Sequence, residues 1–138
     1  MATRRRAREC ALQMLFQFDS SELLPRQVVR LYKDCFGEGP LPDDFAINLF
    51  LGIAESLSDI DNVITSSSDN WRIDRMSRVD RNILRMGVHE ILSSEETGTP
   101  PRVAINEAVE LAKRFGTAES ASFVNGILDR VARDKLKL

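Results

Sequence analysis

The chain has 138 residues, of which 43% are hydrophobic and 29% charged, and its formal net charge at neutral pH is −2. These values are typical of one globular domain with a core that needs neither disulfides nor a metal. No apolar run approaches the ~18 residues needed to cross a bilayer. The first ten residues lack the apolar stretch of a signal peptide, so we expect a cytoplasmic protein with no membrane partner.

The charges are unevenly distributed along the chain. The first eight residues carry four arginines, whereas the remaining 130 carry 15 basic and 21 acidic groups, a net −6. A basic tip on an acidic body predicts a localised anion site, not a wholly basic nucleic-acid binder. The two cysteines, Cys10 and Cys35, fall on apolar helix faces. We expect both to be small buried hydrophobes in a reducing compartment.

Apolar residues recur at helical spacing through most of the chain, and no segment alternates with the period of a strand. The expected helices cover, in chain order, 3–19, 24–36, 43–57, a shorter one opening at 58, 77–93, 103–115 and 120–133. Loops are expected at 37–42 and 93–101, a loop or a frayed helix end at 66–70, and a helix C-cap at Gly116. We therefore predict an all-α fold, a compact bundle or pair of bundles of about seven helices.

Two pairs of residues have the spacing of an N-terminal capping box, with aspartate in place of the usual glutamate or glutamine. These pairs are Ser58 with Asp61 and Ser77 with Asp80. The helix expected at 77–93 is apolar around most of its circumference, so we predict that it is largely enclosed. Asp80 is interpreted either as a helix-cap acid or as a contact for a basic partner. Glu90 is expected to be a buried ion-pair partner.

The first expected helix begins with Arg4, Arg5, Arg6 and Arg8. Arginine at a helix N-terminus opposes the helix dipole, at a cost of ~0.3–1 kcal/mol each at low salt. Because the guanidinium group suits phosphate, we interpret the cluster as a nucleic-acid contact. A frayed, solvated basic tail is the alternative. Lys113, on the outward face of the helix at 103–115, is a further candidate for phosphate, with plain solvation as its alternative.

The opposite face of the first helix carries a large aromatic residue. Phe16 lies about 180° from Ala7, which is in the apolar stripe, and Arg5, Arg8 and Leu12 share its outer side. An aromatic and a leucine on an otherwise polar face indicate a contact site. A neighbouring helix covering that face would explain the pattern equally well, and the residues alone leave both interpretations open.

Catalytic patterns are weak in this sequence. His89 is the only histidine, and neither a glycine-rich phosphate loop nor metal-ligand spacing occurs. We therefore expect no catalytic residue, no metal and no cofactor. An RNA-binding regulatory subunit is the leading hypothesis; a protein-binding adaptor and an RNA-modifying enzyme are the alternatives. The arginine tip favours the first, because it would have no role in a pure adaptor.

Four segments carry a family resemblance. They are RRRARECALQMLFQFD (4–19), VDRNILRMGVHEIL (79–92), VAINEAVELAKRFG (103–116) and SFVNGILDRV (122–131). In order and spacing they resemble the bacterial transcription antitermination factors of the NusB family, over essentially the whole chain and most weakly between residues 20 and 70. The resemblance implies seven helices in two packed sub-bundles, forming one RNA-binding domain over 1–138, and a non-enzymatic role.

The resemblance also implies partners and sites. The partners are the boxA element of nascent single-stranded RNA, the tenth small-subunit ribosomal protein and the RNA polymerase antitermination complex of ribosomal RNA operons. The family includes monomers and homodimers, so a homodimer of the free chain stays open. By matching position, the four arginines, Glu119 and Phe123 are implied to bind RNA, and Phe16 and Asp80 to meet the ribosomal protein. His89 replaces a frequent tyrosine, and Glu119 stands where aspartate also occurs.

Overall fold

The computed structural model describes residues 4–35, 44–69 and 72–136, without the side chains at 34, 35, 44 and 136. The elements in these ranges are all helical: α1 (Arg4–Asp19), α2 (Pro25–Cys35), α3 (Asp44–Glu55), α4 (Leu57–Ser67), a 3-10 turn η1 (Ile73–Arg75), α5 (Arg78–Leu92), α6 (Ser94–Thr97), α7 (Pro101–Phe115) and α8 (Ser120–Leu136). The predicted all-α fold is confirmed. In the described ranges, no helix is long and apolar enough to span a membrane.

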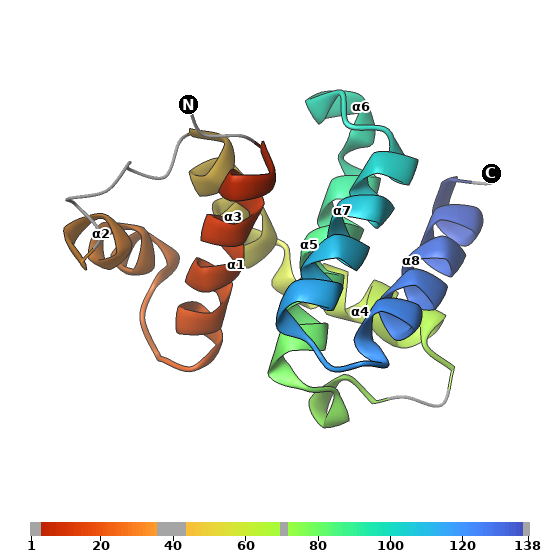
Figure 1. Cartoon of the computed structure of the whole chain (residues 1–138). Helices are drawn as coiled ribbons and strands as arrows, with labels where there is room; N and C mark the ends of the chain where they lie inside the picture. Colours follow the sequence, from red (N-terminus) through yellow and green to blue (C-terminus); the bar gives the residue numbers. More distant parts are fainter. Residues whose placement is uncertain (1–3, 36–43, 70–71, 137–138) are drawn as a thin grey trace. The chain divides into compact units, whose positions relative to one another are not determined.

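The chain divides into two compact units, Met1–Glu55 and Ser56–Leu138. The first holds α1, α2 and α3, and the second holds the helices from α4 onward (Figure 1). This division matches the predicted pair of helical sub-bundles. The helix beyond the predicted seven is α6, a single turn inside the polar segment that was expected to be a linker.

The first unit is built around α1, which packs against both α3 and α2. Residues of all three helices form its core: Ala7, Ala11, Met14, Val28, Ala46, Phe50 and Ile53 are each at most 2% exposed. Phe18 packs edge-to-face on Phe50, with ring centroids 5.8 Å apart. The hydroxyl of Tyr32 on α2 donates a hydrogen bond to Gln13 of α1 at 3.1 Å. Cys10 is free and partly buried, and the Cys35 side chain lies outside the described residues.

The second unit packs α5, α7 and α8 against one another. α5 is enclosed as predicted, since most of its residues from Asn82 to Ile91 are buried. A Cβ at Gly87 would lie 2.5 Å from Cδ1 of Leu128, which is fully buried on α8. The absence of a side chain at Gly87 therefore sets how closely α5 and α8 approach.

Helix ends test the predicted caps. The side chain of Ser77 accepts a hydrogen bond from the backbone N–H of Asp80 at 3.1 Å, which confirms the serine half of this predicted capping box. The cap predicted at Ser58 is wrong: α4 starts at Leu57 after Ser56, which makes no side-chain cap bond. Asp61 instead faces Arg85 of α5. The reason is tertiary, because a buried guanidinium binds a carboxylate more strongly than a helix end does.

Gly116 ends α7, and its N–H donates to the carbonyl of Ala112, but its φ of −98° is not left-handed. Glycine is needed here for space, because a Cβ would lie 2.4 Å from the hydroxyl of Ser120. The Gly- and Pro-rich break predicted at 37–42 lies outside the described residues.

Candidate nucleic-acid interface

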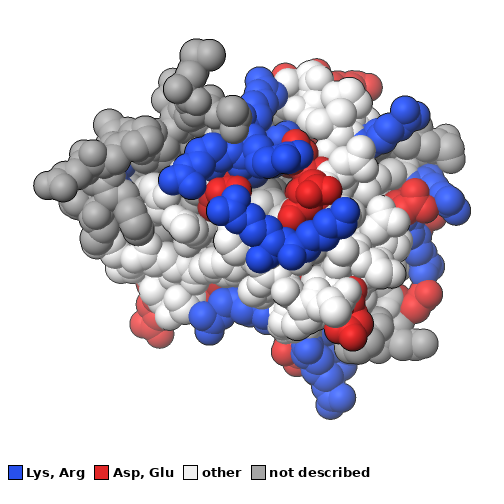
Figure 2. Space-filling view, viewed as in Figure 1, with Lys and Arg blue, Asp and Glu red and all other residues white. Residues whose placement is uncertain are grey.

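The arginines at the start of α1 differ in exposure. Arg4, Arg5 and Arg6 are exposed, whereas Arg8 is buried, with 3% of its surface accessible. Arg6 forms an i,i+3 ion pair with Glu9 at 3.5 Å. Figure 2 shows basic side chains gathered over the first turns of α1. Three exposed guanidinium groups within the first turn concentrate positive charge at the N-terminal end of α1, and guanidinium groups suit phosphate.

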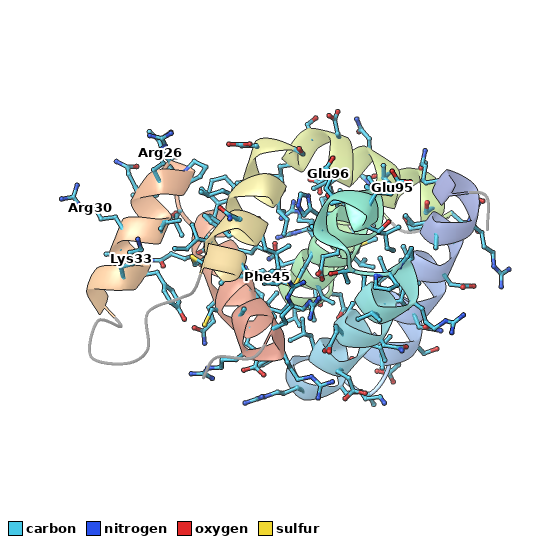
Figure 3. The ribbon with its side chains drawn as sticks, turned by 90° about the horizontal axis from the view of Figure 1, so that it is seen from above. Arg26, Arg30, Lys33, Phe45, Glu95 and Glu96 are labelled. Carbon is cyan, nitrogen blue, oxygen red and sulfur yellow. The ribbon has the colours of Figure 1, made fainter. Side chains whose placement is uncertain are left out.

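Phe45, at the start of α3, holds two of these arginines. The guanidinium carbons of Arg4 and Arg8 lie 4.4 and 5.4 Å from its ring centroid, and Figure 3 labels Phe45 beside α1. Such cation–π contacts contribute roughly 0.5–2 kcal/mol, more when desolvated. They anchor the basic start of α1 to α3, which argues against a frayed tail. The sequence did not predict a role for Phe45, because the contact joins residues about forty positions apart.

A second candidate surface lies where α7 ends and α8 begins. Lys113 is exposed and 3.3 Å from Glu110, and the guanidinium of Arg114 lies 5.2 Å from the ring centroid of Phe115, which is 39% exposed. Phe123, one turn into α8, is partly exposed. Cations beside accessible aromatic rings suit single-stranded RNA, because phosphates pair with the charges and bases stack on the rings.

The loop between these helices is fixed by short-range hydrogen bonds. The Ser120 hydroxyl accepts from the backbone N–H of Thr117 at 2.9 Å, and the Thr117 hydroxyl donates to the exposed carboxylate of Glu119 at 3.3 Å. Glu119 therefore lies just before the N-terminus of α8, where the helix dipole favours a carboxylate. Its acceptor oxygens suit base amino groups, not phosphates.

The predicted partner residues lie in different units. Phe16 is partly exposed on α1, but Leu12, predicted on the same outer side, is 2% exposed and belongs to the core. The alternative of a covered face thus holds for Leu12 and for Arg8. Asp80 is partly exposed on α5, and its Oδ1 is buried without a hydrogen-bond partner among the described residues.

The polar side chains of α5 make contacts inside the second unit. Arg85 is 7% exposed, pairs with Asp61, and donates to the side-chain oxygen of Asn82 at 3.0 Å. Burial lowers the pKa of His89, against the opposing effect of Glu90 and Glu96. Glu90 is buried, as expected, and the ion pair expected for it stays a prediction. Within the described ranges, no group of three or more His, Cys, Asp or Glu side chains forms a metal site.

A family model decides the assignment. The model of the NusB family matches residues 5–133. The chain belongs to the NusB family. It is 45% identical over 136 residues to the transcription antitermination protein NusB of Solibacter usitatus, covering 97% of this chain and 91% of the relative. It is 44% identical over 135 residues to the corresponding protein of Sorangium cellulosum, covering 97% and 94%.

Solved NusB structures share the fold. NusB of T. maritima is 35% identical with a TM-score of 0.78, covering 99% of both chains. A chain from the crystal structure of the antitermination factors NusB and NusE in complex with double-stranded RNA is 25% identical, with a TM-score of 0.80 and coverage of 95% and 96%. The four segments that carried the NusB resemblance lie on α1, α5, α7 and α8.

Proposed function

We propose that this chain is an RNA-binding transcription antitermination factor that acts with the tenth small-subunit ribosomal protein, NusE, on boxA RNA. Membership of the NusB family carries the proposal, because the family is non-enzymatic and its similar curated relatives are transcription antitermination proteins. The similar NusB structure with NusE and RNA supports both partners. We extend the proposal to the cytoplasmic RNA polymerase complex on ribosomal RNA operons, and to a homodimer as an alternative state of the free chain.

Each candidate surface has a chemical role in this proposal. Arg4, Arg5 and Arg6 supply phosphate contacts, and Arg8 adds its charge and shares the Phe45 ring with Arg4. On the α7–α8 surface, Lys113 contacts phosphates, Glu119 contacts base edges and Phe123 contacts base faces. Phe16 and Asp80 are proposed to meet NusE, whose docking compensates for the acidic body of the chain, net −6 beyond residue 8.

A titration with boxA RNA tests the proposal, with and without NusE and at several salt concentrations. The wild type should bind, and NusE should tighten binding by about 5–150-fold, a typical coupling between two sites. Replacing Arg4, Arg5 and Arg6 with alanine should reduce the slope of log K against log salt by about 0.7 for each phosphate that the variant no longer neutralises. Equal affinity and slope in this triple variant would remove α1 from the RNA site.

The matched control replaces three exposed cations of the second unit, Arg102, Arg133 and Lys135, with alanine. This variant loses the same charge, so any long-range effect of net charge appears in both variants. A wild type that binds no boxA RNA, even with NusE present and the protein shown to be folded by circular dichroism, would overturn the proposed function as a whole.

A further inference from the structure

α2 carries a row of cations that the proposed function does not use. Arg26, Arg30 and Lys33 are exposed and stand at i, i+4 and i+7, which places them within about 60° of the helix circumference. We name these three residues the α2 stripe. Figure 3 shows the α2 stripe side chains, which project outward from α2.

The α2 stripe is a local excess of positive charge. The α2 sequence PRQVVRLYKDC holds three basic residues and one acidic residue. In the described part of the chain, the α2 stripe makes no hydrogen bond or ion pair, whereas Arg6, Lys113 and Arg133 each pair with a carboxylate. Like charges three and four residues apart destabilise a helix by a few tenths of a kcal/mol each. An external anion would relieve that repulsion.

The spacing and chemistry of the α2 stripe fit a polyphosphate strand. Its cations are about 6 and 4.5 Å apart along the helix axis, the scale of successive phosphates in an extended nucleic-acid strand. Two of the three are arginines, which bind phosphate with several donors. The stripe holds no aromatic residue on which a base would stack, so its contacts would be independent of sequence.

We propose that the α2 stripe is a second phosphate-binding track, which holds RNA that flanks the boxA element. The inference rests on the proposed function, because the boxA element must already be bound elsewhere on the chain. α1 and α2 belong to one unit, pack against each other and are joined by residues 20–24. The α1 arginines lie at the end of α1 opposite to this linker, so RNA must extend beyond the boxA element and run along the first unit to reach the α2 stripe.

A protein partner fits the α2 stripe less well. Protein interfaces are dominated by buried aromatic and apolar anchors, often beside an arginine. The exposed leucines of this region, Leu24 at 66% and Leu31 at 37%, lie about 140–160° around the α2 axis from Arg26. The α2 stripe itself therefore presents long cationic side chains without an apolar anchor, which favours phosphate.

The test compares a core RNA, boxA alone, with an extended RNA that adds unstructured uridine flanks at both ends. The α2 variant replaces Arg26, Arg30 and Lys33 with glutamine, which keeps helix propensity. The matched control replaces Arg75, Arg102 and Lys135 with glutamine, three exposed cations of the second unit, for the same loss of charge. All titrations include NusE and are repeated over a range of salt.

The wild type should bind the extended RNA more tightly than the core RNA. The α2 variant should lose that gain and keep core affinity, and its salt slope for extended RNA should fall by about 2, or 0.7 for each of three phosphates. The control variant should keep the gain.

An α2 variant whose affinity and salt slope for extended RNA are unchanged overturns the proposal. An α2 variant that no longer binds NusE but still binds RNA also overturns it. Core binding without a gain from the flanks overturns the α2 track alone, whereas no core binding overturns the proposed function.

Discussion

Arg85 on α5 donates hydrogen bonds from two nitrogens to the carboxylate of Asp61 on α4, at 2.8 and 2.9 Å. The Arg85 side chain is 8% exposed and that of Asp61 is 24% exposed. The pair fixes α4 to the enclosed helix of the second unit. A guanidinium buried to this degree depends on its partner, because removal of one member leaves the other charge without compensation.

Asp61→Ala should therefore lower the free energy of unfolding by about 2–4 kcal/mol, somewhat less than for a fully buried pair because Asp61 retains solvent access. Chemical denaturation monitored by circular dichroism measures the change. The control is Asp59→Ala, an exposed acid in the first turn of the same helix, whose loss should cost only about 0.3–1 kcal/mol through the helix dipole. Similar losses in the two variants would contradict the structural role of the pair.

Alanine substitutions at Gly87 and Gly126 should change stability in opposite directions. Gly87→Ala places a methyl group 2.5 Å from buried Leu128, and we expect destabilisation by about 1–3 kcal/mol through overpacking. Gly126 is exposed within α8, and a Cβ added there would have no neighbouring atom within 4 Å. Gly126→Ala should stabilise the chain by about 0.5–1 kcal/mol, because alanine has the higher helix propensity. Melting curves of both variants test the packing of α5 against α8.

Phe45 should matter for RNA binding through its ring. Phe45→Leu keeps an apolar side chain but removes the cation–π contacts of Arg4 and Arg8. These contacts hold the arginines in place, and losing about 0.5–1 kcal/mol of cation–π stabilisation should weaken boxA binding by roughly 2–5-fold. Phe45→Tyr retains the ring and should bind like the wild type. If both substitutions weaken RNA binding equally, the ring does not position the arginines.

His89 should make stability depend on pH. Burial lowers its pKa, so the unfolded chain binds the proton more readily than the folded chain does. The contribution of this group to stability is complete above the ordinary histidine pKa, which applies to the unfolded chain, and it declines as the pH falls from that value through the lower pKa of the folded chain. His89→Gln should remove this component. The wild type should therefore lose unfolding free energy relative to the variant as the pH falls from about 7.5 to 5.5, a range that spans the ordinary histidine value. A constant difference would show that protonation of His89 is not linked to folding.

Helical periodicity predicted the fold well, because each long amphipathic helix carries its own pattern. It placed α1, α2, α5 and α7 to within about two residues, the usual uncertainty of helix ends. It missed α6, because one turn is too short to show a period. It also misassigned Asp61, whose partner on α5 is 24 residues away and invisible to local spacing.

In the candidate site, too, features with a local sequence pattern could be predicted and features set by tertiary packing could not. The arginines of α1 could be predicted from charge alone, since their position opposes the helix dipole. Neither the difference between exposed Arg5 and buried Arg8 nor the role of Phe45 could be predicted, because both depend on which helix packs beside α1. The outward face assigned to Leu12 was wrong for the same reason.

Phe16 provides the test of the partner surface. The residue is partly exposed on α1, so an aspartate there would carry a charge into any apolar contact that a partner makes with the ring. Phe16→Asp should abolish co-purification with NusE, because an interface with an unpaired buried charge loses several kcal/mol. Because the ring is only partly buried in the free chain, unfolding should become easier by no more than about 1–2 kcal/mol. Phe16→Tyr keeps the ring and serves as the control, with NusE binding retained. Loss of NusE binding together with a collapse of the melting transition would instead place Phe16 in the core and remove it from the partner surface.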